Sequence, residues 1–162
     1  MNYHNIETGS SVNGEGVRTV LWVAGCSHRC KGCHNPETWD MYGGKPFDAE
    51  AEKELFDSME PFVSGITLSG GDPLFRFNRE AIFQLITDFK HKFPDRTIWL
   101  YTGYEWEDIL EMKNFPFLDV DVVVCGPFIE GLKDPSYHWA GSTNQRVIKC
   151  PESYSNNRVI NY

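Results

Sequence analysis

Short apolar segments typical of buried strands alternate along this chain with amphipathic helical patterns. Segment 19–24 is almost wholly apolar and rich in β-branched and aromatic residues, which favours a buried strand. In segment 82–89 the apolar residues recur at the i, i+3, i+4 and i+7 spacing of one helical face. The other strand candidates are 65–69, 97–101, 120–124 and 145–149, and the other helix candidates are 48–60, capped by Asp48, and 105–112. This alternation predicts an α/β domain with a mostly parallel sheet and right-handed crossovers.

The same alternation predicts where the functional site lies. In a parallel sheet the carboxyl ends of the strands share one edge, and ligands bind just beyond that edge. The unusual loops of this chain each follow a strand candidate, at residues 25–35, 70–73, 102–104 and 125–127. We therefore expect these four loops to line a single site.

Length and charge exclude several classes of protein. The chain has 162 residues, which is one domain, whereas a complete eight-fold βα barrel needs about 250. Its net charge of −8 opposes binding to phosphate backbones, so nucleic acid is not an expected partner. No apolar run reaches the roughly 18 residues of a membrane span, and the first residues lack the basic and apolar regions of a signal peptide. We expect a cytoplasmic protein without a membrane partner.

Three of the five cysteines lie within one short loop. Cys26, Cys30 and Cys33 have the spacing C-x₃-C-x₂-C, which is typical of metal ligands rather than of disulfides, and thiolates suit iron–sulfur clusters and zinc. Three thiolates hold three corners of a cubane cluster. The open fourth iron favours binding of a small molecule over simple electron transfer. The alternative is a zinc site completed by His28 or His34.

The two remaining cysteines are not expected to bind metal. Cys125 ends an apolar strand candidate, which predicts a small, buried, hydrophobic side chain. Cys150 is expected to be an ordinary thiol beside the polar tail 151–162, and that tail is expected to be held only loosely.

Several further stretches carry a resemblance to a known family. They are 13–19, the cysteine segment 25–33, the following His-Asn-Pro-Glu-Thr-Trp at 34–39, Leu-Ser-Gly-Gly-Asp-Pro-Leu at 68–74, 98–104 and 141–146. Together they resemble the radical S-adenosylmethionine activating enzymes, and within them the activators of the anaerobic ribonucleoside-triphosphate reductase. The likeness extends from Asn2 to about Ile148. It implies an incomplete, open (βα) barrel of the radical S-adenosylmethionine type, as a single domain over 1–162 with a core at about 14–150.

The resemblance also implies a reaction. In such enzymes the three cysteines hold a [4Fe–4S] cluster, and the amino and carboxylate groups of S-adenosylmethionine chelate the fourth iron. One electron cleaves the sulfonium, and the 5′-deoxyadenosyl radical makes a glycyl radical on the anaerobic ribonucleoside-triphosphate reductase. The implied electron donor is a flavodoxin or a ferredoxin. No catalytic residue is implied beyond the cluster and the cofactor.

The resemblance assigns cofactor contacts residue by residue. Gly32, Cys33 and His34 are implied to lie against the adenine, and Thr102 against the ribose or the methionine. Gly70, Gly71 and Asp72 resemble the loop that receives the methionine amino group. Two glycines permit close backbone approach, and a carboxylate is a charge-assisted acceptor for an ammonium.

Charged residues near these motifs have a simpler interpretation. Arg18, Arg29 and Lys31 are expected to be surface or structural charges, and Arg18 is the one favoured for a cofactor or partner contact because it precedes the first predicted strand. The stretch 141–146 is polar, and it is expected to bind the partner, shape the pocket edge or simply form a turn.

Two departures from the family pattern keep alternatives open. Cys125-Gly126 stands where the family usually has aspartate-glycine, so the missing carboxylate is expected to come from Asp121 or a neighbour. His34 stands where reductase activators often have tyrosine, as in activators of pyruvate formate-lyase. The alternatives are an activator of another such glycyl-radical enzyme, a radical enzyme with a small-molecule substrate, and a non-catalytic iron–sulfur carrier or zinc module.

Overall fold

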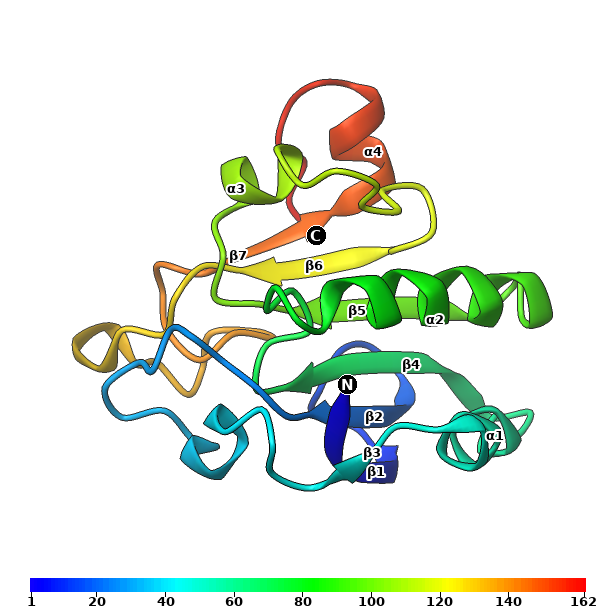
Figure 1. Cartoon of the computed structure of the whole chain (residues 1–162). Coiled ribbons are helices and arrows are strands. Elements are labelled where there is room, and N and C mark those ends of the chain that lie inside the picture. The colour runs from blue at the N-terminus through cyan, green and yellow to red at the C-terminus, as the bar shows by residue number, and fades with distance from the viewer.

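The structure is a computed structural model that describes residues 1–162, and it is built on one seven-stranded sheet (Figure 1). The strands follow the spatial order β3-β1-β2-β4-β5-β6-β7. Their bounds are β1 Asn2–Ser10, β2 Val17–Val23, β3 Lys45–Pro46, β4 Val63–Gly70, β5 Thr97–Tyr101, β6 Val122–Cys125 and β7 Arg146–Lys149. The sheet has β3 and β7 as its edges and is not closed.

The four central strands β2, β4, β5 and β6 are parallel, whereas β1 and β7 are antiparallel to their neighbours. The sheet is therefore mixed, with a parallel centre. Parallel neighbours require crossover connections, and these contain the helices α1 (Ala49–Asp57), α2 (Arg79–Lys92) and α3 (Trp106–Leu110). The open sheet and its helices leave the assignment to a particular type of barrel as a prediction.

The helices pack against one face of the sheet, where the main core lies (Figure 1). In β2 and β4 alternate residues such as Leu21 and Leu68 join Leu85 and Phe89 of α2 in a single buried cluster. The Asp48 side chain caps α1 by accepting a hydrogen bond from the backbone N–H of Ala51 at 3.0 Å, which confirms the predicted helix start. None of the helices combines the length and the apolar composition that crossing a bilayer requires.

The opposite face of the sheet carries a smaller cluster of Trp99, Val122 and Val124. Arg18 points to this face and lies over the Trp99 ring, with its guanidinium carbon 5.6 Å from the ring centre. Its side chain is fully buried and donates to five oxygens, which are Thr67 Oγ1, Thr97 Oγ1 and the carbonyls of Glu15, Ile66 and Thr97. Arg18 is thus a structural residue that ties β2 to β4 and β5.

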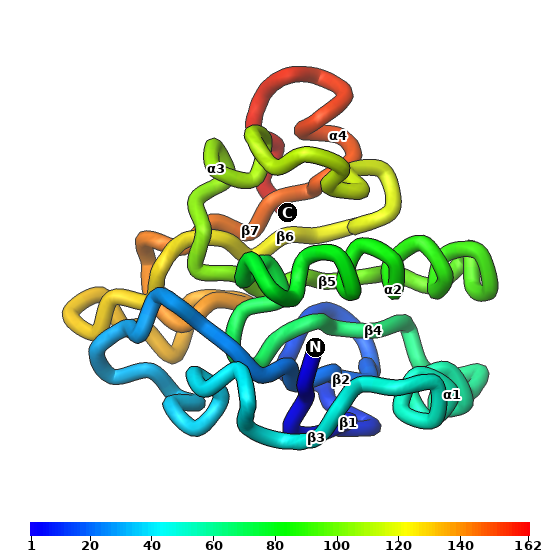
Figure 2. The backbone as a smooth tube through the Cα atoms, viewed as in Figure 1, coloured from blue at the N-terminus to red at the C-terminus, as the bar shows by residue number.

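The C-terminal tail differs from the expectation that it is loosely held. It forms helix α4 (Cys150–Ser155) and then returns alongside β7, where Figure 2 marks the C-terminus. The backbone N–H of Lys149 donates to Ile160, and that of Tyr162 donates to Val147, both at 2.9 Å. The Tyr162 ring packs edge-on against Trp99 at 4.9 Å. Pairing with the edge strand β7 and this aromatic contact hold the tail in place, although nothing in its polar sequence indicated either contact.

Strand β1 and two short 3₁₀ helices were also not expected from the sequence. Strand β1 pairs with β2 and β3 although its sequence is mostly polar, and only a few of its side chains, among them Tyr3 and Ile6, are buried. Two short 3₁₀ helices lie in the loops, at Pro36–Trp39 and Glu130–Leu132.

Candidate functional site

The four loops that follow the parallel strands meet at one cavity of about 480 Å³. They gather beyond the carboxyl ends of β2, β4, β5 and β6, at the left of the view in Figure 1. All but one of the predicted site residues line this cavity, namely Cys26, Cys30, Cys33, His34, Gly70, Gly71, Asp72 and Thr102. The exception is Gly32, which lies beside the Glu130 side chain on the exposed side of the loop.

The cysteine loop is fixed at its start and exposed in its middle. The backbone N–H groups of Gly25 and Cys26 donate to the carbonyls of Thr38 and Trp39 at 2.8 and 3.1 Å. All three loop thiols are free and partly buried, and burial raises the pKa of Cys26. No group of three or more His, Cys, Asp or Glu side chains is arranged at metal-binding distances. The role of the three cysteines as ligands therefore stays a prediction.

The Gly70–Asp72 loop lies directly on the cysteine loop. The backbone N–H of Asp72 donates to the carbonyl of Gly25 at 2.8 Å, and that of Gly71 donates to Val23 at 2.8 Å. A Cβ on Gly71 would lie 2.5 Å from the Gly25 carbonyl oxygen. The absence of a side chain at Gly71 is thus required for the two loops to touch.

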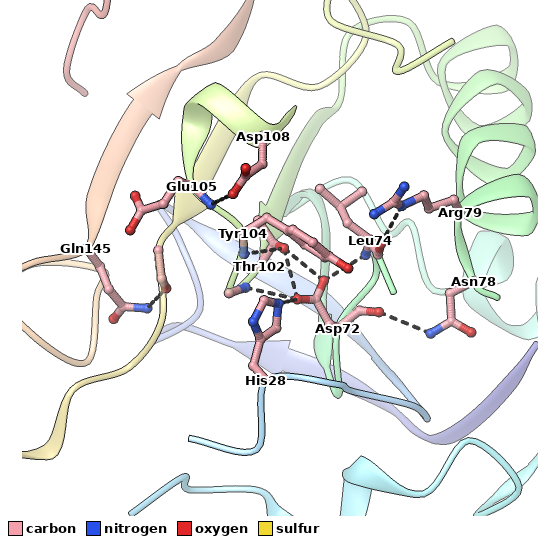
Figure 3. A network of polar contacts seen from close by, with 12 residues as sticks. His28, Asp72, Leu74, Asn78, Arg79, Thr102, Tyr104, Glu105, Asp108 and Gln145 are labelled. Atoms are coloured by element: carbon pink, nitrogen blue, oxygen red, sulfur yellow. Dashed lines mark hydrogen bonds and ion pairs between the residues drawn. The ribbon is translucent and has the colours of Figure 1, made fainter. Parts of the chain in front are cut away.

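Asp72 is the polar centre of the site (Figure 3). Its side chain is 1% exposed. Its carboxylate accepts hydrogen bonds from the backbone N–H groups of Leu74 and Gly103 at 2.8 and 3.0 Å and from the Thr102 hydroxyl at 2.8 Å. His28 Nε2 lies 2.9 Å from the same carboxylate, although it is not aligned as a hydrogen-bond donor. Asp72 and Thr102, both predicted as cofactor contacts, therefore contact each other.

Besides His28 Nε2, two buried polar atoms at the cavity have no hydrogen-bond partner in the protein. They are the Tyr101 hydroxyl and Trp39 Nε1, and both residues line the cavity. Burial also raises the pKa of the Tyr101 phenol, so it stays protonated as a donor. Buried donors usually find an acceptor, which makes these two available to a polar ligand. Tyr101 was not among the predicted site residues, although its place at the end of β5 was a usable signal.

The only role predicted for His28 from the sequence was that of a zinc ligand. Its ring lies between the cysteine loop and the loop after β5, in edge contact with Tyr104 at 4.7 Å. Its position between Cys26 and Cys30 indicated a place in the site, but nothing in the sequence indicated its contact with the Asp72 carboxylate.

The far wall of the cavity comes from the loops after β6. Gly126, Phe128, Gly141 and Gln145 line it, and the Gln145 side chain donates to the Gly126 carbonyl at 2.9 Å. The stretch 141–146 therefore shapes the pocket edge, one of its predicted roles. His34 packs against Phe128 with ring centres 5.2 Å apart.

The remaining candidates lie away from the cavity. Cys125 is fully buried, as predicted, and burial raises its pKa to about 11. Cys150 is fully buried too, rather than lying beside a loose tail. The suggestion that Asp121 supplies the missing carboxylate is wrong, because its side chain accepts from the Ile98 backbone N–H and pairs with Lys90, at 2.7 and 2.9 Å. It precedes β6, at the opposite end from the cavity.

The donor set suits an iron–sulfur cluster with a polar organic ligand. Three thiols from one loop line the cavity, and thiolates are the ligands that such clusters use. No fourth cysteine lines the cavity, and the side chains of Cys125 and Cys150 are buried in the core. The unpartnered Tyr101 hydroxyl and Trp39 indole supply donors beside the thiols.

Comparison with known proteins agrees with this site. Residues 12–148 match the family model of the 4Fe-4S single cluster domain. The chain is 42% identical over 148 residues to the anaerobic ribonucleoside-triphosphate reductase-activating protein of Enterobacteria phage T4, covering 91% of this chain and 93% of the relative. It is 39% identical over 151 residues to the protein of that name from Escherichia coli K12, and 37% identical over 150 residues to that from Haemophilus influenzae, each match covering 91% of this chain and 97% of the relative. The chain therefore belongs to the family of anaerobic ribonucleoside-triphosphate reductase-activating proteins and has a 4Fe-4S single cluster domain.

Proposed function

We propose that this protein cleaves S-adenosylmethionine reductively at a [4Fe–4S] cluster and thereby makes a glycyl radical on an anaerobic ribonucleoside-triphosphate reductase. The observation that carries the proposal is the shared cavity: three free thiols of one loop and the Gly70–Asp72 loop line it together. A cluster and an organic cofactor can meet only where both sets of residues share one space.

In this proposal Cys26, Cys30 and Cys33 hold the cluster, and one iron has no thiolate from the protein. When bound, the reduced cluster and S-adenosylmethionine supply a one-electron cleavage that yields methionine and a 5′-deoxyadenosyl radical, which takes a hydrogen atom from a glycine of the reductase. The electron comes from a flavodoxin or a ferredoxin. The five cysteines are all free, which suits a reducing compartment such as the cytoplasm.

The residues of the chain bind and orient the cofactor. Gly70 and Gly71 present backbone to the methionine amino group without side chains in the way. The buried Asp72 carboxylate adds a negative charge behind them. His34 lines the cavity beside Cys33, and the proposal places the adenine there, whereas Gly32 lies outside the cavity and is left out of the assignment. Thr102 lies next to Asp72, where the proposal places the ribose or the methionine.

Two cavity donors extend this assignment beyond the sequence motifs. The Tyr101 hydroxyl and the Trp39 indole N–H are buried, unpartnered and adjacent to the cavity. We assign them to acceptor atoms of the bound cofactor, because an unsatisfied buried donor costs about 1–3 kcal/mol. Substitution of Tyr101 by phenylalanine removes one such donor and preserves the ring.

The test is electron paramagnetic resonance of the anaerobically reconstituted, reduced protein with and without S-adenosylmethionine. The expected result is a cluster signal that changes on addition of the cofactor, because the open iron gains ligands. Cys30→Ser is expected to lose the signal, and the matched control Cys125→Ser is expected to keep it. A signal that ignores the cofactor would indicate an electron carrier, and retained zinc without a cluster would indicate a zinc module.

The partner is tested separately by adding a reductase. We expect a glycyl radical on the anaerobic ribonucleoside-triphosphate reductase and none on pyruvate formate-lyase. A radical on the second protein alone would assign the chain to the alternative partner. Turnover of S-adenosylmethionine with a free small substrate and no radical on either protein would contradict glycyl-radical activation.

A further inference from the structure

We infer that His28 is a positioning residue whose imidazole anchors the cysteine loop to the Asp72 carboxylate, so that the cluster-binding loop and the cofactor-binding loop form one unit. The inference rests on the proposed function, since it concerns the placement of the thiols relative to the cofactor site. It assigns a role to the one side chain between Cys26 and Cys30 that reaches the loops after β4 and β5.

The His28 ring occupies a fitted slot (Figure 3). Its Nε2 atom is 2.9 Å from Asp72 Oδ2, and its side chain is 21% exposed. On another side it meets the Tyr104 ring edge-on, with an interplanar angle of 79°. A Cβ on Gly103 would lie 2.5 Å from the ring carbon Cδ2. Gly103 therefore provides the space that the imidazole fills.

Asp72 is held rigidly enough to serve as the anchor. Two backbone N–H groups and the Thr102 hydroxyl already bind its carboxylate. A carboxylate offers about four acceptor sites, and these three donors occupy most of them, while His28 Nε2 lies at ion-pair distance, 2.9 Å from Oδ2. No lysine or arginine side chain lies within ion-pair distance of the buried Asp72 carboxylate, and His28 is the one basic side chain there. An apolar side chain in place of His28 would leave the buried Asp72 carboxylate with no basic side chain within ion-pair distance.

Asp72 contacts the cysteine loop on both sides of the first thiol. Its backbone N–H donates to Gly25 at 2.8 Å, just before Cys26, and its carboxylate meets His28 just after it. These two contacts fix Cys26 relative to the Gly70–Asp72 loop. Residues that orient metal ligands in this way typically contribute 10–100-fold to metal affinity.

The tests use the full chain with three single variants and one control. His28→Ala removes the anchor, and His28→Gln replaces it with a side-chain amide donor of similar reach. Gly103→Ala leaves His28 intact but fills its slot. His91→Ala is the control, because His91 is an exposed histidine at the end of α2.

Three quantities are measured: the rate at which a chelator removes iron from the reconstituted protein, the affinity for S-adenosylmethionine, and the rate of alkylation of the loop thiols in cluster-free protein. His28→Ala and Gly103→Ala are expected to speed iron loss and weaken cofactor affinity by roughly tenfold and to speed alkylation. His28→Gln is expected to restore most of each loss, and His91→Ala to change none. Thermal unfolding of each variant identifies any that fails to fold.

The outcomes separate this inference from the proposed function. Wild-type values in His28→Ala would overturn the positioning role. Complete loss of the cluster in both His28→Ala and His28→Gln, with unchanged alkylation, would instead indicate that His28 is a ligand and would also overturn it. If the wild-type cluster ignores S-adenosylmethionine, the proposed function fails, yet the alkylation rates of the cluster-free variants still test the anchor.

Discussion

Replacement of Arg18 by methionine tests whether this buried cation is structural, as its five hydrogen bonds indicate. Methionine keeps much of the length and all of the apolar stem, so the packing loss is small. The change removes the Arg18 donors from the carbonyls of Glu15, Ile66 and Thr97 and from the hydroxyls of Thr67 and Thr97, which belong to β4, to β5 and to the loop before β2. The side chain does not line the cavity, so binding of the cluster is not directly affected.

The expected loss of stability follows from two opposing terms. Each hydrogen bond to a charged donor contributes about 1.5 kcal/mol at the low end of the usual range, so five contribute about 7 kcal/mol. The pKa of Arg18 is lowered from 12.5 to about 10, mainly by burial and against the opposing charges of Asp121 and Glu15, which corresponds to a net cost of about 3 kcal/mol for the charged form. Losing the bonds while recovering that cost leaves a net destabilisation of about 4 kcal/mol. A single domain has about 5–15 kcal/mol in total.

The assay is urea unfolding of the cluster-free protein at neutral pH, followed by tryptophan fluorescence. With a slope of about 2 kcal/mol per molar urea, the midpoint of Arg18→Met is expected to fall by about 2 M. Arg158→Met is the control, because Arg158 is exposed and its side chain makes no hydrogen bond or ion pair. A midpoint for Arg18→Met within about 0.5 M of wild type would refute the structural role.

Three further results are expected. In native, cluster-free protein at pH 8, iodoacetamide should modify the three loop cysteines and spare Cys125 and Cys150. With a pKa of about 11 for Cys125, about one of its thiols in a thousand is ionised at this pH. Modification of Cys125 would therefore contradict its burial in the core. Because folding raises the pKa of Cys125, its thiol contributes to the free energy of unfolding fully below the pKa of the unfolded chain, near 9, and this contribution is lost as the pH rises through 11. From this group, the free energy of unfolding should be about 1 kcal/mol lower at pH 10 than at pH 8, and Cys125→Ala should lack that part of the decline. Deletion of residues 160–162 removes the pairing with β7 and the Tyr162–Trp99 contact. It should lower the midpoint of thermal unfolding by several degrees, at about 2–4 °C per kcal/mol of lost stability. An unchanged midpoint would mean that the tail is loose in solution.

Local sequence patterns were sufficient for much of the fold. The prediction of a strand at 97–101 matches β5 at both ends, because β-branched and aromatic residues bounded by polar ones leave little freedom in that assignment. The Asp48 cap was predicted for the same kind of local reason. The meeting of four loops at one cavity followed from chain direction alone, since parallel strands all present their carboxyl ends to the same edge.

Contacts between distant segments had no comparable local signal. The pairing of β1 with β2, the return of the tail to β7 and the enclosure of Arg18 each depend on the partner that folding brings near. Arg18 illustrates the difficulty, because the same residue before a strand suits a cofactor contact or a structural network. Only its oxygen partners on β4 and β5 decide between them.

The glycines of the site show that the sequence can predict where the site loops lie but not what their glycines contact. Gly71 and Gly103 follow strands in loops where a cofactor is expected, and the absence of a side chain suits close approach by a ligand. In the structure the space beside Gly71 is taken by the Gly25 carbonyl, and the space beside Gly103 by the His28 ring. Both glycines therefore permit contact with the cysteine loop. An alanine at either position would push that loop, and its thiols, away from Asp72, so the cluster site depends on these glycines for the contact between the loops, in addition to any contact that their backbones make with a ligand.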